Sequence, residues 1–222
     1  MKPQSTIGRA TTPDGKEIVL SERDGAYSIR VNGLELMSSR AHGSEEALAR
    51  LVLDRVSHPA PTVLVGGLGM GFTLRAVLDR VSPKSRVVVA EIFPAVVGWN
   101  RTELSHLARS PLDDSRVIVE ECDVGNLVSA NPRSYDAILL DVDNGPAAFT
   151  VARNERLYGP AGLAAIRRSL RPRGVLGVWS ADPDRPFAKR LKNTKFAVTI
   201  ETVSARDRAK GPKHTIFIAE MK

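Results

Sequence analysis

The sequence predicts an α/β protein: a doubly wound parallel sheet that ends in an antiparallel strand pair and is preceded by a small β-hairpin region. Three observations predict this fold class. From Thr62 onward, short apolar runs alternate with helical segments, as in parallel sheets covered by helices. Residues 1–40 instead hold strand-like runs separated by turn dipeptides. Finally, a chain of 222 residues, 42% of them hydrophobic, can bury one large core.

The N-terminal region contains three strand-like runs, Glu17–Leu20, Tyr27–Val31 and Leu34–Met37. The dipeptides Asp24-Gly25 and Asn32-Gly33 separate them. An Asn-Gly dipeptide favours a two-residue hairpin, because both turn positions need positive φ. We therefore expect antiparallel hairpins in this region.

A helix follows, with Ser44 as its predicted N-cap, because apolar residues recur on one face. These residues are Ala47, Leu48, Leu51, Val52 and Val56. The prolines of Pro59–Pro61 end the helix and mark a boundary. We therefore divide the chain into a hairpin region with its helix, residues 1–58, and a main domain, residues 59–222.

The main domain alternates strands and helices. Strands are expected at Thr62–Val65, Arg86–Ala90, Arg116–Glu120, Ala137–Leu140 and Gly174–Trp179. Helices are expected at Thr73–Val81, Ala95–Leu107 and Pro160–Leu170. Ala197–Val203 and Thr215–Ala219 are typical of a final antiparallel pair.

Composition narrows the class of protein. No apolar run approaches the roughly 20 residues of a membrane span, and Met1–Thr12 lacks the apolar centre of a secretory signal. The single cysteine, Cys122, excludes an internal disulfide, and four histidines argue against a structural zinc site. We expect a soluble, cytoplasmic protein without a metal and without a membrane partner.

The charge is uneven, because residues 185–222 hold ten Lys and Arg against three acidic residues, whereas the whole chain holds 32 against 25. A basic surface attracts anions, nucleic acid included. The basic segment could therefore bind nucleic acid, or it could simply form a charged face exposed to solvent.

The residues that follow the predicted parallel strands are candidates for a ligand site, because ligands bind at the carboxyl ends of such strands. The glycine-rich segment Gly66–Gly71 follows the first strand, Glu91 the second and Asp123 the third. Asp141 and Asp143 follow the fourth. Glycines let the backbone approach a ligand, and a carboxylate at Glu91 can accept both hydroxyl protons of a ribose.

Each element also has a purely structural interpretation. The glycines of Gly66–Gly71 can serve helix packing, Glu91 can be an exposed acid at a strand end, and Asp123 can cap a helix. Asp143 begins the turn sequence Asp143–Pro146. The spacing Gly67-x-Gly69-x-Gly71 lacks the third glycine of the dinucleotide fingerprint, and no phosphate-cradling G-x-x-x-x-G-K-[ST] loop is present. The pattern thus favours an adenosyl ligand without a pyrophosphate.

Five segments resemble the spermidine synthase (polyamine aminopropyltransferase) family. They are Val63–Arg75, Glu91, Cys122-Asp123, Tyr135–Asp141 and Leu170–Gly174. Asn32-Gly33 and the Ser44-Glu45-Glu46 helix start resemble that family's β-hairpin domain and substrate gate. The resemblance implies a Rossmann-like methyltransferase fold and a transferase that uses S-adenosylmethionine or its decarboxylated form.

The resemblance also implies roles for individual residues. Those implied for the cofactor are Gly67, Leu68, Gly69, Gly71, Glu91, Ile92, Asp123 and Asp141. Asp141 is the expected base that deprotonates the acceptor, and His42 and His214 are alternative bases. Asp141 could instead contact the cofactor or make a structural hydrogen bond at the strand end. Apart from the resemblance, residues 15–40 are too short to bury both faces of a hairpin region, which is marginal in water when isolated. We therefore expect them to pack against the main domain and a second copy of the chain, giving a homodimer.

The sequence departs from the family at three acceptor positions. Met70 stands where polyamine-forming members carry an aspartate, Asn144 stands at the second aspartate after strand four, and Ser44 replaces a tyrosine. These changes remove charge-assisted hydrogen bonds to a cationic amine. We therefore expect a small acceptor other than putrescine; a nucleic-acid methyltransferase and a non-catalytic adenosyl-binding protein are the alternatives.

Overall fold

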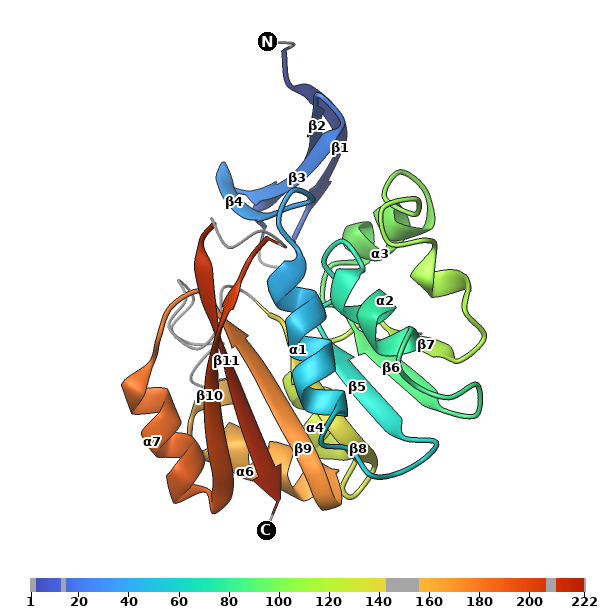
Figure 1. Cartoon of the computed structure of the whole chain (residues 1–222). Coiled ribbons are helices and arrows are strands. Elements are labelled where there is room, and N and C mark those ends of the chain that lie inside the picture. Colours follow the sequence, from blue (N-terminus) through green and yellow to red (C-terminus); the bar gives the residue numbers. More distant parts are fainter. Residues whose placement is uncertain (1–2, 13–14, 143–155, 207–210, 222) are drawn as a thin grey trace.

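The computed structural model describes residues 3–12, 15–142, 156–206 and 211–221. Asp143 and Asn144, singled out in the sequence, lie outside the described residues. The described chain forms a four-stranded antiparallel sheet and a seven-stranded mixed sheet. Figure 1 shows the smaller sheet, in blue, set against one end of the larger one.

The smaller sheet has the order β1-β2-β3-β4. Its strands are β1 (Ser5–Thr11), β2 (Glu17–Arg23), β3 (Ala26–Val31) and β4 (Leu34–Ser38). Both residues of each predicted turn have positive φ: 50° and 76° at Asp24-Gly25, and 48° and 80° at Asn32-Gly33. The expected hairpins are confirmed, and β1, which the sequence pattern did not predict, adds a fourth strand.

The larger sheet has the order β10-β11-β9-β8-β5-β6-β7. Its strands are β5 (Thr62–Gly66), β6 (Arg86–Ala90), β7 (Val117–Glu120), β8 (Tyr135–Leu140), β9 (Leu170–Ser180), β10 (Phe196–Ser204) and β11 (Lys213–Met221). Strands β9, β8, β5, β6 and β7 are parallel, whereas β11 runs antiparallel to β9 and β10 to β11. The predicted fold class is thereby confirmed. The strand order reverses between β5 and β8, which is where such sheets bind ligands.

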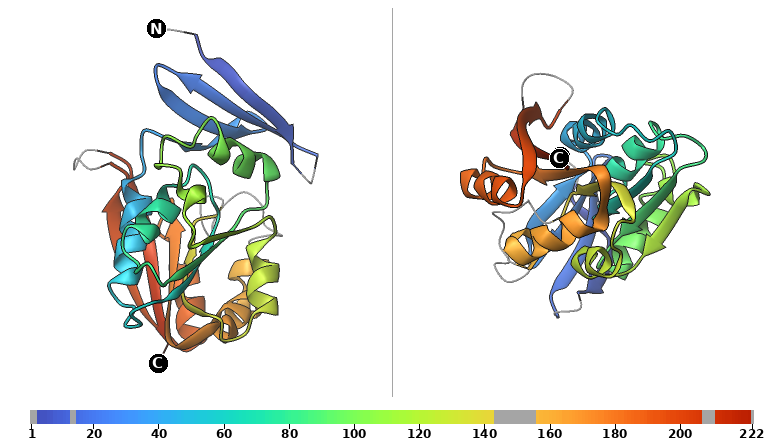
Figure 2. Two further views of the ribbon diagram at one scale, coloured as in Figure 1. Left: turned by 90° about the vertical axis from the view of Figure 1, so that its right-hand side faces the viewer. Right: turned by 90° about the horizontal axis from the view of Figure 1, so that it is seen from below.

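Helices cover both faces of this sheet, as the side view in Figure 2 shows. They are α1 (Gly43–Leu53), α2 (Phe72–Leu78), α3 (Pro94–Arg101), α4 (Val124–Ala130), α6 (Pro160–Ser169) and α7 (Arg185–Asn193), with a 3-10 turn at Pro111–Asp113. Strand side chains alternate between two cores: Val63 and Val65 pack with α1, α2 and α3, whereas Leu64 packs with α4, α6 and α7. None of the helices in the described part is long and apolar enough to cross a membrane.

The smaller sheet shares the first of these cores. Ile18, Leu20 and Ile29 are buried in the same apolar cluster as Leu48 of α1. Helix α1 in turn packs on α2 and β9. The division of the chain between residues 58 and 59 stays a prediction.

Three helix boundaries were predicted wrongly. The helix expected over Thr73–Val81 is α2, which ends at Leu78 with Asp79 as its C-cap. Helix α1 begins at Gly43 with His42 at its N-cap, so Ser44 is not the cap; its hydroxyl is engaged by Glu45 and His214 instead. The helix expected over Ala95–Leu107 ends at Arg101, because Thr102 leaves the helical region with φ −126° and ψ −96°.

Candidate functional site

The glycine turn after β5 lies against the ends of both neighbouring strands. Gly67 N donates to the carbonyl oxygen of Ala90 at 2.8 Å, and Asp141 N donates to that of Gly66 at 2.9 Å. Gly67 has φ 91°, and a Cβ there would stand 2.3 Å from the carbonyl oxygen of Asp141. Only glycine permits this approach, so the turn and the end of β8 are packed backbone to backbone.

Two buried side chains hold this turn in place. The side-chain amide of Asn100, on α3, donates to the carbonyl oxygens of Gly69 at 2.8 Å and Val96 at 2.9 Å. The Glu91 carboxylate accepts from the N–H of Leu68 at 3.0 Å and the N–H of Phe93 at 2.9 Å, one on each oxygen. Asn100 was not predictable from the sequence, because a single Asn inside an apolar helix carries no distinguishing pattern.

Glu91 is only 6% exposed, so the interpretation as an exposed strand-end acid is wrong. Burial raises the pKa of the Glu91 carboxyl, and the backbone N–H groups of Leu68 and Phe93 counteract part of that rise. A buried carboxylate beside a glycine turn is a strong acceptor for hydroxyl groups, because little water competes for it.

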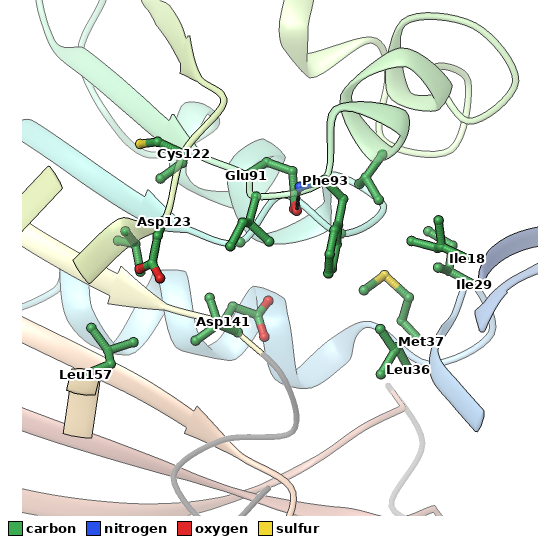
Figure 3. A pocket seen from close by; sticks show the side chains of 17 residues that line it. Ile18, Ile29, Leu36, Met37, Glu91, Phe93, Cys122, Asp123, Asp141 and Leu157 are labelled. Carbon is green, nitrogen blue, oxygen red and sulfur yellow. Dashed lines mark hydrogen bonds between the residues drawn. The ribbon is translucent and has the colours of Figure 1, made fainter. Parts of the chain in front are cut away.

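A cavity of about 100 Å³ opens at the carboxyl ends of β5, β6 and β8. Six residues predicted to bind the cofactor line it: Gly67, Gly69, Glu91, Ile92, Asp123 and Asp141. Figure 3 shows Asp123 and Asp141 on one side, with Leu36 and Met37 of β4 facing them from the smaller sheet. We call this space the Glu91 cavity.

The remaining two predicted residues lie elsewhere. Leu68 lines a neighbouring cavity. Gly71 is the N-cap of α2, and a Cβ there would contact Pro111, Ala108 and Asn100 at 3.0–3.2 Å. Gly71 lines neither cavity, and its contacts are those of a tightly packed helix start.

Asp123 has two functions in the fold. Its Oδ1 atom accepts from the N–H of Gly125 at 2.7 Å and caps α4, which confirms the helix-cap interpretation. The same residue lines the Glu91 cavity, next to Cys122. Burial raises the pKa of the Cys122 thiol, as expected of a small apolar filler.

A second cavity, of about 290 Å³, adjoins the first. The two cavities share Leu36, Met37, Gly69 and Asp141 as lining residues. The second is also lined by Glu45, Met70, Phe72, Thr73, Trp179 and His214, among others. We call it the Glu45 cavity, and Asp141 stands at the junction of the two.

The Asp141 carboxylate is oriented by α2, because its Oδ2 atom accepts from the Thr73 hydroxyl at 2.6 Å. Burial raises the pKa of Asp141 to about 6, and the Thr73 hydrogen bond opposes that rise. A carboxyl with this pKa is mostly ionised at neutral pH and is a stronger base than an ordinary aspartate.

Glu45 approaches the same space from the first turn of α1. The Ser44 hydroxyl donates to Glu45 Oε2 at 2.6 Å, and the same Ser44 oxygen lies 2.9 Å from His214 Nδ1. Burial, followed by the negative charge of Asp141, raises the pKa of Glu45 to about 7. The His214 ring packs edge-on against Trp179 at 4.6 Å, and burial lowers its pKa, so it is neutral at physiological pH.

Of the other residues selected from the sequence, some line the Glu45 cavity and one lies outside both cavities. His42 stacks on Phe72 at 4.2 Å and bonds Glu46, and it lines neither cavity. His214 and Met70 line the Glu45 cavity, and Met70 is 3% exposed. Across the described ranges, no group of three or more His, Cys, Asp or Glu side chains is arranged to hold a metal ion.

A family model and the similar solved structures point to the same protein family. Residues 41–205 match a family model described as the spermine/spermidine synthase domain. No curated protein matches the chain by sequence. Among solved structures, spermidine synthase from Thermotoga maritima superposes with a TM-score of 0.79 at 20% identity, over 98% of this chain and 73% of that one.

Two further structures are similar. A spermidine synthase in complex with the transition state analogue AdoDATO has a TM-score of 0.78 at 19% identity, over 98% of this chain and 73% of that one. A probable spermidine synthase from Corynebacterium glutamicum ATCC 13032 has a TM-score of 0.63 at 18% identity, over 99% of this chain and 81% of that one. At these identities the likeness shows a shared fold.

Proposed function

This chain belongs to the spermine/spermidine synthase domain family, and on that premise we propose that it is a transferase that binds S-adenosylmethionine or its decarboxylated form and alkylates a small acceptor. The observation that carries the proposal is the position of Asp141, which lines both cavities at their junction. One cavity then holds the adenosyl group and the other the acceptor, with a carboxylate between them.

The Glu91 cavity has the chemistry that an adenosyl group needs. Glu91 would accept from the ribose hydroxyls, Asp123 would lie near the adenine amino group, and Ile92 with Gly67 and Gly69 would form part of the wall. Leu68 and Gly71 would act indirectly, by holding the glycine turn in place. Apolar side chains from the smaller sheet, including Met37, close the opposite side. When bound, the sulfonium supplies an activated alkyl carbon whose leaving group is a neutral thioether.

The chain's own contribution to the reaction is orientation and proton transfer. Thr73 holds the Asp141 carboxylate at the junction of the cavities. Asp141 would accept the proton that the acceptor loses. Its raised pKa favours this step, because the carboxylate binds the proton more strongly than an exposed aspartate would.

We propose further that putrescine is a poor acceptor. Met70 is buried in the wall of the Glu45 cavity, at the position where the spermidine synthases that this sequence resembles carry an aspartate. Replacing an acid by Met removes a charge-assisted hydrogen bond of roughly 1.5–3 kcal/mol. The Ser44 hydroxyl, in place of a tyrosine, is already engaged by Glu45 and His214.

A nucleic-acid acceptor finds no support at these cavities. Among the described residues that line them, none is Lys or Arg, so neither cavity attracts a phosphate backbone. Of the basic residues of 185–222, those that the structure describes lie outside both linings.

Two finer expectations are also proposals. We propose a homodimer formed through the smaller sheet, because Leu34 is 62% and Ile7 38% exposed there, while the core side chains of the same sheet are buried. We propose a cytoplasmic location, because a single cysteine cannot form an internal disulfide and the fold therefore does not depend on an oxidising compartment.

The test of the proposed function is a titration followed by a turnover assay. Calorimetry with S-adenosylmethionine, its decarboxylated form and methylthioadenosine should show binding of at least one of them. With decarboxylated S-adenosylmethionine and putrescine, turnover should stay far below about 1 per second. Spermidine formed at that rate or faster would contradict the putrescine proposal, and no binding of any adenosyl ligand would contradict the function itself.

A further inference from the structure

An open groove of about 780 Å³ lies between α1, α2 and the segment Leu107–Arg109 that follows α3. Figure 1 shows the two helices side by side. The groove is separate from the two cavities described above: among the described residues, only Phe72 lines both it and the Glu45 cavity, and none is shared with the Glu91 cavity. We call it the arginine groove, after the arginines in its lining, which are Arg50, Arg75, Arg80 and Arg109.

The lining of the arginine groove is positively charged. Its described carboxylates are Glu46 and Asp79, so the four arginines leave a net charge of +2 when His42 is neutral. Asp54, just outside the lining, pairs with Arg80 at 3.4 Å. The charge stays positive even when Asp54 is counted. In contrast, no described residue that lines the two cavities is Lys or Arg.

The carboxylates of the groove leave guanidinium donors unused. Asp79 accepts from Arg75 at 2.7 Å and also from Arg109, so one carboxylate serves two arginines. Glu46 bonds His42 Nδ1 at 2.8 Å rather than an arginine. The Arg50 side chain makes no hydrogen bond or ion pair within the described ranges. Since a guanidinium has five N–H donors, the groove presents free donors from both helices and from the third wall.

The shape of the groove leaves room for a ligand between these donors. Several lining residues have the smallest side chains, namely Gly43, Ala47, Ala76 and Ala108. On the third wall, Arg109 and the following Ser110 both have positive φ, of 55° and 45°. Two consecutive non-glycine residues rarely adopt this left-handed conformation, and strained backbone of this kind is concentrated at binding sites.

We propose that the arginine groove binds a phosphate-bearing small molecule. The planar fork of a guanidinium matches the oxygens of a phosphate, and arginines on separate walls can reach different oxygens of one ligand. A single-stranded nucleic acid fits less well, because it needs exposed aromatic rings on which bases stack. The one aromatic ring of Phe, Tyr or Trp in the described lining, that of Phe72, is stacked against His42 at 4.2 Å. This site goes beyond the proposed function and does not depend on it.

The experiment is calorimetric titration of inorganic pyrophosphate into the full chain at pH 8 and low salt. Arg50→Gln and Arg109→Gln each remove one positive charge from the groove, and Arg50→Lys keeps the charge but not the fork. Glu46→Gln removes a negative charge from the lining without touching an arginine ion pair. The control is Arg185→Gln, which makes the same change at an exposed position of α7, on the opposite face of the large sheet.

We expect Arg50→Gln and Arg109→Gln each to weaken pyrophosphate binding about three- to tenfold. Arg50→Lys should retain more affinity than Arg50→Gln. Glu46→Gln should strengthen binding about two- to fivefold, because it raises the positive charge of the groove. Arg185→Gln should bind as the parent protein does, and saturating methylthioadenosine should not displace pyrophosphate. The gain expected for Glu46→Gln cannot arise from a damaged fold.

A parent protein that does not bind pyrophosphate would overturn the inference, as would an equal loss in Arg50→Gln and Arg185→Gln or an unchanged affinity in Glu46→Gln. Displacement by methylthioadenosine would place the anion in the cleft and overturn it too. A short oligothymidylate that binds more tightly than pyrophosphate, and loses affinity with Arg50→Gln, would replace the small molecule by nucleic acid. Failure of methylthioadenosine to bind would count against the proposed function alone, so the two failures are distinguishable.

Discussion

Substituting Glu91 tests the adenosyl site most directly. The Glu91 carboxylate is buried and accepts one backbone N–H on each oxygen, from Leu68 and Phe93. Glu91→Gln keeps the shape of the side chain but turns one acceptor oxygen into an NH₂ donor. One of the two backbone N–H groups then loses its partner, which costs about 1–3 kcal/mol of stability.

The same substitution should also weaken ligand binding. A charge-assisted hydrogen bond from a ribose hydroxyl contributes roughly 1.5–3 kcal/mol, so losing it weakens binding about ten- to a hundredfold. Calorimetric titration of methylthioadenosine into the parent protein and into Glu91→Gln measures this loss. Glu121 is exposed and directly follows β7, so Glu121→Gln makes the same change of charge and should leave the dissociation constant unchanged.

A disturbed glycine turn could weaken binding without any ribose contact, and an analogue separates the two causes. The 2′-deoxy analogue of methylthioadenosine should bind the parent protein more weakly than methylthioadenosine does. In Glu91→Gln the difference between the two ligands should shrink, because the charged acceptor is replaced by a single neutral carbonyl oxygen. If the parent protein does not distinguish the two ligands, the assignment of Glu91 to the ribose is refuted.

Two further predictions concern pH and assembly. Turnover with an acceptor that must lose a proton should rise from pH 5 to pH 8, as Asp141, with a pKa of about 6, and Glu45, with a pKa of about 7, become ionised. The free energy of unfolding should change in the opposite direction. Folding raises both pKa values, so the folded state binds more protons than the unfolded state between about pH 4 and pH 7. These two groups therefore lower the free energy of unfolding as pH rises. Melting temperatures against pH should show this slope in the parent protein and a smaller one in Glu45→Gln; equal slopes would contradict the interaction between Glu45 and Asp141. Light scattering at tens of micromolar should give twice the chain mass of 24.1 kDa, and Leu34→Lys should reduce it towards one chain mass; a monomeric parent protein would contradict the homodimer.

The large sheet was predictable because its strands are buried on both faces and therefore appear as apolar runs such as Val63–Val65 and Val87–Val89. The acids that follow those runs were predictable for the same reason. Once the strands are parallel and adjacent, Glu91, Asp123 and Asp141 must meet at one edge of the sheet, and all three line the Glu91 cavity. Local sequence and topology together were sufficient for that part of the site.

Glu45 and Asn100 were not predictable, because their positions depend on how a helix packs against the sheet. Glu45 meets Asp141 across 96 residues of sequence, and only the docking of α1 on α2 and β9 places it there. The Ser44 cap failed for a related reason: the hydroxyl bonds His214 on β11, a partner that no local pattern reveals. Tertiary contacts of this kind override local capping preference.

The position of Asp141 connects the fold to the proposed chemistry. It follows β8, and the strand order reverses between β5 and β8, so the backbone on either side of that point diverges and leaves room for a ligand. The smaller sheet closes one side of this opening through Leu36 and Met37, which line both cavities, and α1 closes the other through Glu45. Since α1 follows directly after the smaller sheet, a shift of that sheet would move Glu45 relative to Asp141. The N-terminal region therefore affects the acceptor side of the site as well as the adenosyl side, although the family's recognisable glycine turn and acids belong to the large sheet.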